Sequence, residues 1–162
     1  MVAQSEDNDY YLRHLLDGTR AGAGTIFMDY RNSTDLSDFN TIIYGHHMKN
    51  GTMFAFLLNY REQEYYETHP SLFLYTPGHR YRIEMIAGYT TGVEDGIYSL
   101  PATKENRDAI LEHAKKESDF TSNVTVDEED KLVTLSTCAY EYPNARYVVI
   151  GRLVEESSQS MR

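Results

Sequence analysis

The sequence predicts a mainly β fold, a closed or nearly closed antiparallel barrel that carries helices in its connections. Three observations favour this class. The chain contains fourteen tyrosines and six phenylalanines, which are typical strand residues. Turn residues separate its short apolar runs, and only four prolines interrupt it. Its 162 residues fit one domain with one core, so we expect a single domain over residues 1–162.

Six apolar and β-branched runs between turn residues predict six strands. In chain order they are Thr25–Asp29, Thr41–Tyr44, Ser71–Tyr75, Tyr81–Tyr89, Leu132–Thr137 and Arg146–Val154. The two ends of the chain lack such a pattern. We therefore expect Met1–Asp7 to be unpacked and residues 155–162 to form a flexible tail.

The first helix predicted between the strands is Met53–Thr68. Thr52 is its expected N-cap, because a threonine hydroxyl can accept a hydrogen bond from the first turn. Phe54, Leu57 and Leu58 follow the i, i+3, i+4 spacing of a buried helix face.

The second predicted helix is Lys104–Glu117, with Thr103 as N-cap. Ile110 and Ala114 are four positions apart and are expected to face inward. This helix lies in the long connection before the strand Leu132–Thr137.

Charge and composition exclude several functions. The net charge of −10 disfavours nucleic-acid binding and gives no polybasic membrane patch, so a neutral or cationic ligand is expected. No apolar stretch is long enough to span a bilayer, and the N-terminus is too polar for a signal peptide. One cysteine excludes an internal disulfide, which fits a cytosolic protein or an exported protein without bridges.

That cysteine, Cys138, follows directly after the strand Leu132–Thr137. A strand end is a rigid platform for a nucleophilic thiol, provided that a cation stabilises the thiolate. Arg146 opens the next strand eight positions later (146 − 138), and a hairpin would return it to the sulfur. The residues alone leave two alternatives open, a buried inert thiol and a surface arginine.

Another apolar strand, Thr41–Tyr44, leads through Gly45 to His46 and His47. We expect Gly45 to permit a turn and His46 to reach the thiol. Ordinary turn histidines and a metal-binding pair are the alternatives. Metal binding is disfavoured because neighbouring strand residues point to opposite faces, and no Cys or carboxylate lies at a zinc-like spacing.

At these residues the sequence closely resembles the class B sortases. The resemblance rests on Tyr-Gly-His-His-Met-Lys-Asn-Gly-Thr-Met-Phe at 44–54 and on Thr-Leu-Ser-Thr-Cys-Ala-Tyr-Glu-Tyr at 134–142, followed by Arg146. It extends to Asn-Asp-Tyr-Tyr-Leu at 8–12 and Gly-Thr-Ile-Phe-Met-Asp-Tyr-Arg-Asn at 24–32. The segment from about residue 92 to 122 is similar to the long insertion of this class.

The resemblance implies an eight-stranded sortase barrel and a cysteine transpeptidase. Such an enzyme cleaves a C-terminal sorting signal of an exported protein and transfers the acyl group to an amine. By position, Cys138 matches the nucleophile, His46 the catalytic histidine and Arg146 the catalytic arginine. His47 matches no catalytic position. Ala139 stands where some members carry an acidic residue, so no fourth catalytic group is assigned.

The resemblance also implies substrate contacts and partners. The expected contacts are Asn8, Leu12, Ile97, Tyr98, Ser136 and Thr137. As alternatives, Leu12 is plain core, Asn8 a helix cap and Ser136 an ordinary strand residue. The implied partners are a sorting-signal peptide and an amine acceptor, either a cell-wall precursor or a pilin lysine. No metal or organic cofactor is expected.

The family's membrane anchor, N-terminal helix and first strand would precede this sequence. We therefore expect a barrel lacking an edge strand, or keeping only its last piece in Met1–Ser5, and a full-length form anchored at the outer face of a Gram-positive membrane. Two other functions remain open at this stage. One is a cysteine peptidase that only hydrolyses its substrate, and the other is a binding module that does not turn peptides over.

Overall fold

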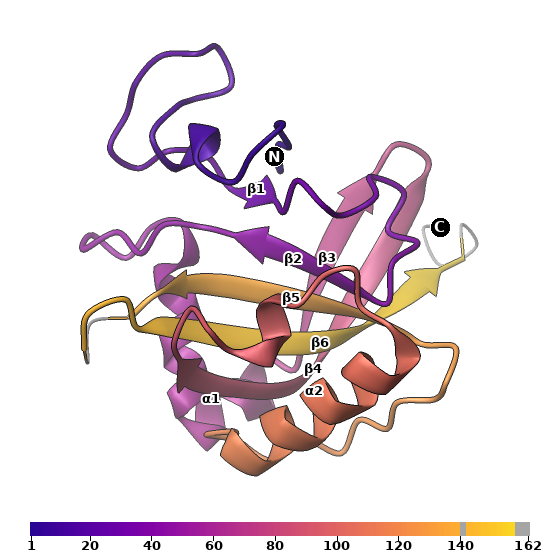
Figure 1. Cartoon of the computed structure of the whole chain (residues 1–162). Helices are drawn as coiled ribbons and strands as arrows, with labels where there is room; N and C mark the ends of the chain where they lie inside the picture. Colours follow the sequence, from indigo (N-terminus) through magenta and orange to yellow (C-terminus); the bar gives the residue numbers. More distant parts are fainter. Residues whose placement is uncertain (140–141, 158–162) are drawn as a thin grey trace.

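The computed structural model describes residues 1–139 and 142–157. Its strands form one curled sheet, in the order β1-β2-β5-β6-β4-β3 (Figure 1). They are β1 (Phe27–Met28), β2 (Asn40–Tyr44), β3 (Ser71–Thr76), β4 (His79–Thr91), β5 (Lys131–Cys138) and β6 (Arg146–Glu156). The mainly β class is confirmed, and each predicted strand is present with ends that differ by at most two residues.

The sheet is mixed, which corrects the expectation of an antiparallel barrel. β2 pairs with β5 in parallel, whereas the other four strand pairs are antiparallel. A parallel pair needs a crossover connection, and here the chain passes through β3, β4 and the intervening helices before it reaches β5. The sheet of described strands ends at β1 on one side and β3 on the other.

The N-terminus is tied to the edge strand β1. Ala3 forms a parallel bridge with Phe27, and its N–H donates to the Ile26 carbonyl at 3.0 Å. The N–H of Met28 donates in turn to the Ala3 carbonyl at 2.8 Å. The prediction that Met1–Asp7 is unpacked is therefore wrong at Ala3, and the expected strand remnant in this segment does pair.

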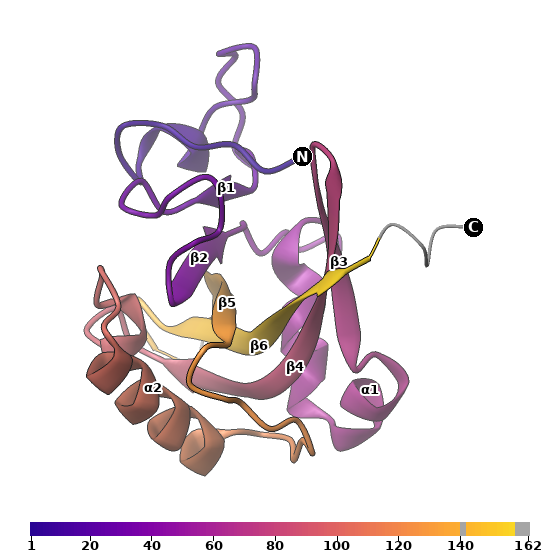
Figure 2. The ribbon, with the colours of Figure 1, turned by 90° about the vertical axis from the view of Figure 1, so that its right-hand side faces the viewer.

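Both faces of the sheet are covered. Figure 2 shows α1 (Gln63–Thr68) and α2 (Lys104–Glu117) on opposite sides of the curled sheet. Along β6, Tyr147 and Val149 pack in the cluster with the first helical region, whereas Val148 and Ile150 pack in the cluster with α2. Because both of its faces are buried, β6 contains the continuous run Tyr147–Ile150, in which all four side chains are fully buried.

The predicted helix Met53–Thr68 is two elements. The 3₁₀ helix η2 spans Phe54–Arg61, and α1 follows after Glu62, whose backbone is extended. The N-cap position belongs to Met53, whose φ is 59°, so the Thr52 cap prediction is wrong. The Thr52 hydroxyl instead donates to Asn50 Oδ1 at 2.7 Å. Of the predicted apolar face, Phe54 and Leu57 are buried and Leu58 is partly buried.

The second predicted helix is confirmed over the same residues as α2. The Thr103 hydroxyl accepts from the N–H of Asn106 at 3.2 Å, as expected of an N-cap. Ile110 and Ala114 are buried against the sheet. Arg107, 2% exposed, donates to two backbone carbonyls of the loop that leads into β5 and so ties α2 to that strand.

At the C-terminus, β6 continues to Glu156, and Glu155 and Glu156 pair with β4. The predicted tail is therefore wrong at its first two residues, and its residues 158–162 lie outside the described part of the chain. None of the described helices is long and apolar enough to cross a membrane.

Candidate active site

Two of the three proposed catalytic residues lie side by side because β2 and β5 are parallel. In this pair Tyr44 is opposite Ser136. The N–H of Gly45 donates to the Ser136 carbonyl at 3.1 Å, which carries the pairing one step beyond β2. Parallel strands end at the same edge of a sheet, so His46 and Cys138, each two residues farther along, lie at the same edge.

Arg146 reaches the same edge from the other side. It is the first residue of β6 and the register partner of Cys138 in the antiparallel pair β5–β6. The N–H of Ala139 donates to the Ala145 carbonyl at 2.9 Å, one step beyond this pair. The predicted hairpin is thus confirmed. Residues 140–141 of the quoted motif lie outside the described residues.

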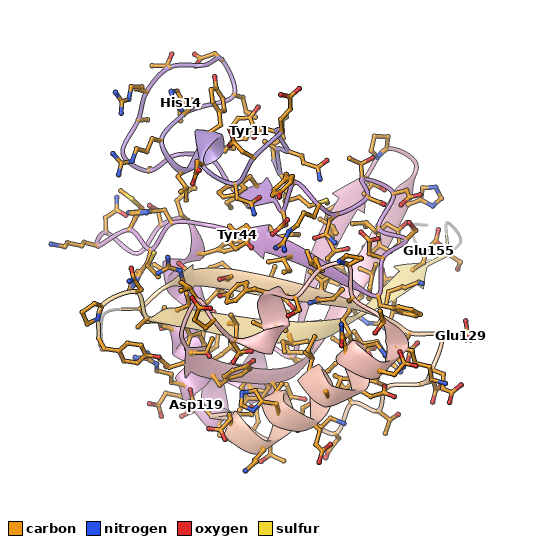
Figure 3. All side chains as sticks on the ribbon, in the orientation of Figure 1. Tyr11, His14, Tyr44, Asp119, Glu129 and Glu155 are labelled. Atoms are coloured by element: carbon orange, nitrogen blue, oxygen red, sulfur yellow. The ribbon has the colours of Figure 1, made fainter. Side chains whose placement is uncertain are left out.

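The three side chains share one cavity of about 280 Å³. Its lining consists of Asn8, Leu12, Phe27, Tyr44, Gly45, His46, Val93, Tyr98, Ser136, Thr137, Cys138 and Arg146. Figure 3 shows Tyr44 on β2, below the N-terminal segment that carries Tyr11 and His14. The cavity therefore lies between that segment and the ends of the central strands.

The two neighbouring histidines have different environments. His46 lines the cavity, and its carbonyl accepts from the N–H of Phe54 at 3.0 Å. The ring Nδ1 of His47 lies 3.1 Å from the carbonyl oxygen of Cys138. His47 thus contacts the backbone that carries the thiol. Within residues 1–139 and 142–157, no three His, Cys, Asp or Glu side chains form a group able to hold a metal ion.

Gly45 is required for space. A Cβ at this position would lie 2.4 Å from Cγ of the Phe54 ring, far inside normal contact distance. Phe54 is 6% exposed and belongs to the core beneath the site. Gly45 was expected to permit a turn, but its role here is in packing. Because it has no side chain, the backbone after β2 can lie directly against the Phe54 ring.

Of the six predicted substrate contacts, five line the cavity, namely Asn8, Leu12, Tyr98, Ser136 and Thr137. Ile97 does not. Its side chain is 0% exposed and packs in the cluster under α2, so the expectation for this residue is corrected. Ile97 and Tyr98 are neighbours in the short 3₁₀ helix η3 (Gly96–Tyr98), where consecutive side chains diverge, and only Tyr98 reaches the cavity.

The alternatives for Leu12 and Asn8 are also decided. Leu12 is 46% exposed and is therefore not a core residue. Asn8 does not cap the 3₁₀ helix η1 (Tyr10–Leu12), because Asp7 Oδ1 accepts from the N–H of Tyr10 at 2.8 Å. The Asn8 amide instead donates to Asp29 Oδ2 at 2.9 Å, and its Oδ1 accepts from a backbone N–H at 2.9 Å.

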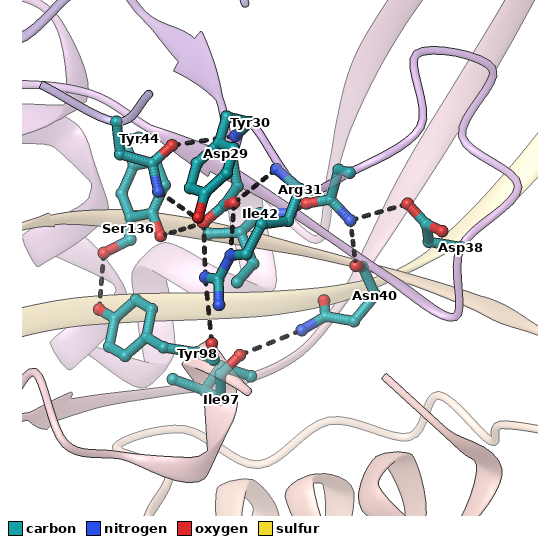
Figure 4. Close-up of polar contacts among 12 residues, drawn as sticks. Asp29, Tyr30, Arg31, Asp38, Asn40, Ile42, Tyr44, Ile97, Tyr98 and Ser136 are labelled. Carbon is teal, nitrogen blue, oxygen red and sulfur yellow. Dashed lines mark hydrogen bonds and ion pairs between the residues drawn. The ribbon is translucent and has the colours of Figure 1, made fainter. Parts of the chain in front are cut away.

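Asp29 is the centre of a buried polar network beside the cavity (Figure 4). Its side chain is fully buried and accepts from Nε and Nη2 of Arg31, both at 2.9 Å. It also accepts from the Tyr44 hydroxyl at 2.8 Å and from Asn8. Burial alone would raise the pKa of Asp29, but the hydrogen bonds, those from Arg31 first, outweigh burial and lower the pKa.

The same network reaches the opposite wall of the cavity. Arg31 Nη2 donates to the Tyr98 carbonyl at 3.2 Å, and the Tyr98 hydroxyl lies 2.8 Å from Ser136 Oγ. Burial raises the pKa of Tyr98 to about 12, so its hydroxyl stays protonated at neutral pH. Asp29 and Arg31 thus connect the wall formed by Asn8 with the wall formed by Tyr98.

Several of these residues were not predicted from the sequence as part of the site. Phe27, Tyr44 and Val93 line the cavity, and Asp29 lies behind it. Tyr44 could have been found, because it is two positions before His46 and shares its side of the chain. The loop residue Val93 carries no such signal.

The site consists of a thiol, an imidazole and a guanidinium at the ends of three adjacent strands. Together with the curled sheet, it defines a mainly β protein with a cysteine-centred site. The family model of the sortase domain matches residues 5–154. The chain therefore belongs to the sortase family.

The relatives place it among the class B members. It is 44% identical over 159 residues to sortase B of Listeria monocytogenes. The matched region covers 94% of this chain and 63% of the relative. It is 32% identical to sortase B of Staphylococcus aureus, over 96% of this chain and 65% of the relative. The chain thus spans a little under two thirds of the length of these curated relatives. The resemblance to class B sortases is confirmed.

A solved structure supports the same assignment. The Staphylococcus aureus sortase B–substrate complex superposes with a TM-score of 0.89 at 31% identity, over 96% of this chain and 74% of that one.

Proposed function

We propose that this chain is a cysteine transpeptidase of the class B type. It cleaves the sorting signal of an exported protein and transfers the new C-terminus to an amine. The observation that carries the proposal is the convergence of His46, Cys138 and Arg146 on one cavity. Sortase B relatives and a sortase B–substrate complex of the same fold support it.

In the first half of the proposed reaction, the Cys138 thiolate attacks the scissile carbonyl carbon and forms a C–S bond. Arg146 donates hydrogen bonds to the oxyanion that develops on the carbonyl oxygen. The C–N bond then breaks, and His46 gives its proton to the leaving amine. The acyl group remains on Cys138 as a thioester.

In the second half, an amine attacks the thioester carbon while neutral His46 takes its proton. The new C–N bond replaces the C–S bond, and Cys138 leaves as a thiolate. If water attacked instead, the chain would be a peptidase, so the acceptor decides between these two activities. The expected acceptors are a cell-wall precursor, which gives anchoring, and a pilin lysine, which gives polymerisation.

The walls of the cavity are the proposed peptide-binding surface. Asn8 and Leu12 supply the N-terminal wall, and Tyr98 with Ser136 the opposite one. Thr137 also lines the cavity, and its buried hydroxyl has no hydrogen-bond partner among the described residues. We further propose that the chain forms one domain and that the full-length form works, membrane-anchored, at the outer face of a Gram-positive membrane.

The decisive experiment is mass spectrometry of the protein after incubation with a library of sorting-type peptides. We expect a peptide fragment to become attached to Cys138. When an amine is added, this fragment should be released as an amide. Cys138→Ala should keep the fold by circular dichroism and lose all cleavage. Cleavage by this variant would refute the assignment. Release as free acid alone, with every amine tested, would establish the peptidase.

A further inference from the structure

A second cavity, of about 520 Å³, adjoins the catalytic histidine. It is lined by Leu12, Arg13, Arg20, Ala21, Gly22 and His46. Only Leu12 and His46 are shared with the cavity that contains Cys138. His46 therefore stands between two spaces, one beside the thiol and one beside two arginines.

The arginines are brought together by a short hairpin-like loop. His14 and Arg20 form an antiparallel bridge, and the N–H of Ala21 donates to the Arg13 carbonyl at 2.9 Å. The His14 ring stacks on Tyr10, with 4.2 Å between ring centroids, which anchors the loop to η1. Arg20 is thus opposite His14 and Arg13 opposite Ala21, and both arginines line the cavity.

These two cations have no carboxylate partner within the described ranges of the chain. Arg31, Arg82 and Arg152, by contrast, are each paired with a carboxylate at 3.0 Å or less. The chain as a whole carries a net charge of −10, which favours neutral or cationic ligands. Two unpaired guanidinium groups beside His46 are therefore a local exception that suits an anion.

We infer that this second cavity binds the acyl acceptor and selects amines that carry a carboxylate or phosphate group. The inference rests on the proposed function, because it assigns the second substrate of that reaction. During the second half-reaction the thioester and its peptide occupy the cavity beside Cys138. The amine must then reach His46 from another side, and the arginine-lined cavity is open to that residue.

The acceptor's anionic group pairs with Arg13 and Arg20, which holds its neutral amine near His46. The imidazole takes one amine proton as nitrogen bonds to the thioester carbon, and the C–S bond breaks to give the Cys138 thiolate. The products are an amide, a thiolate and an imidazolium.

The test compares acceptors that differ in charge. The acyl donor is the peptide that acylates Cys138 in the library experiment, and the probes are triglycine with its neutral amide, triglycinamide. O-phosphoethanolamine and ethanolamine form a second pair. We expect kcat/KM for the anionic member of at least one pair to be about fivefold higher, as expected of two partly exposed charge pairs. This ratio should shrink in high salt.

The variants are Arg13→Gln, Arg20→Gln and the double change, with Lys49→Gln as control. Lys49 is an exposed cation three positions after His46 that lines neither cavity. The double variant should bring the ratio close to one, and the control should keep it. The readout is the ratio of kcat/KM for the two acceptors of a pair, measured with the same variant. A slower acylation step affects both acceptors equally and does not change this ratio.

The outcomes separate the two proposals. A preference in the carboxylate pair or in the phosphate pair supports the inference and identifies the anion. Equal use of both members in both pairs, or a ratio unchanged in the double variant, would overturn it while transpeptidation itself stands. If Cys138 is never acylated, the proposed function fails, and this inference fails with it.

Discussion

The two neighbours of β5 deliver the proposed catalytic groups to Cys138 in different ways. On one side, β6 is the antiparallel arm of a hairpin, and Arg146 is eight residues from the thiol. On the other side, β2 is parallel, and His46 is 92 residues away (138 − 46). The position of Arg146 opposite Cys138 follows from local spacing, because a hairpin connects β5 to β6. The position of His46 depends on the whole crossover between β2 and β5, and on the packing that holds β2 in register.

Replacing the histidine supplied by the parallel side should have the largest effect on turnover. We expect His46→Ala to lower kcat by about 10²–10⁴, the usual contribution of a general acid–base group. His47→Ala should do far less, because His47 contacts the Cys138 carbonyl and does not line the cavity. Steady-state cleavage of the selected peptide measures both. Equal losses would contradict the distinction between the two neighbours.

On the hairpin side, Arg146→Ala and Arg146→Lys should each lower the cleavage rate by about 10²–10³, the cost of losing an oxyanion donor in other enzymes. Lysine keeps the charge but loses the planar fork. Alkylation of Cys138 by a small neutral reagent should change much less, since that reaction forms no oxyanion. An Arg146→Lys enzyme that keeps most of its activity would instead assign Arg146 a general electrostatic role.

A change in the Asp29 network beside the cavity should have a smaller effect on peptide cleavage. Asp29→Asn should raise KM for the peptide about tenfold with a smaller change in kcat, because Asn8 and Tyr44 lose their shared charged acceptor. Asp38→Asn is the matched control. Asp38 accepts from Asn32 and from a backbone N–H of the same loop, and neither Asp38 nor these two partners line the cavity. If the two variants had the same effect, the role of Asp29 would be structural only.

The same carboxylate predicts a pH effect on stability. The pKa of Asp29 is lowered in the folded state, so its stabilisation is complete above its unfolded pKa of about 3.9 and is lost as pH falls through the folded value. The parent protein should therefore lose more stability than Asp29→Asn as the pH is lowered from about 5 to 3. Thermal unfolding across this range measures the difference. Parallel curves would show that Asp29 titrates alike in both states.

At the exit of β2 the expected effect is on the stability of the fold. Gly45→Ala should destabilise the fold by about 1–3 kcal/mol, the usual cost of overpacking, because its Cβ would meet the Phe54 ring at 2.4 Å. Gly92→Ala is the control, since a Cβ there has nothing within 4 Å. Denaturant unfolding measures both changes. An unchanged midpoint for Gly45→Ala would show that Phe54 moves aside freely.

Much of this arrangement was accessible from the sequence. Apolar runs and turn residues identified all six strands, and α2 was predicted with its Thr103 cap. The strand ends that carry Cys138 and His46 were recognised because polar residues follow apolar runs directly. The first helix was predicted less well. The structure divides it at Glu62, whose backbone is extended, and its first part begins at Phe54 with Met53, at positive φ, as N-cap.

The sequence by itself determined the strands, the hairpin that places Arg146 opposite Cys138, and the resemblance to class B sortases. The strands and the hairpin depend on neighbours in the chain and on side-chain alternation, which a sequence displays directly, and the resemblance rests on the motifs quoted above. Only the tertiary structure decided that β2 and β5 run in parallel, that Ile97 is core while Tyr98 lines the cavity, and that Asp29 joins two walls of the site. Each of these depends on contacts between distant segments, and local spacing contains no record of where such segments meet.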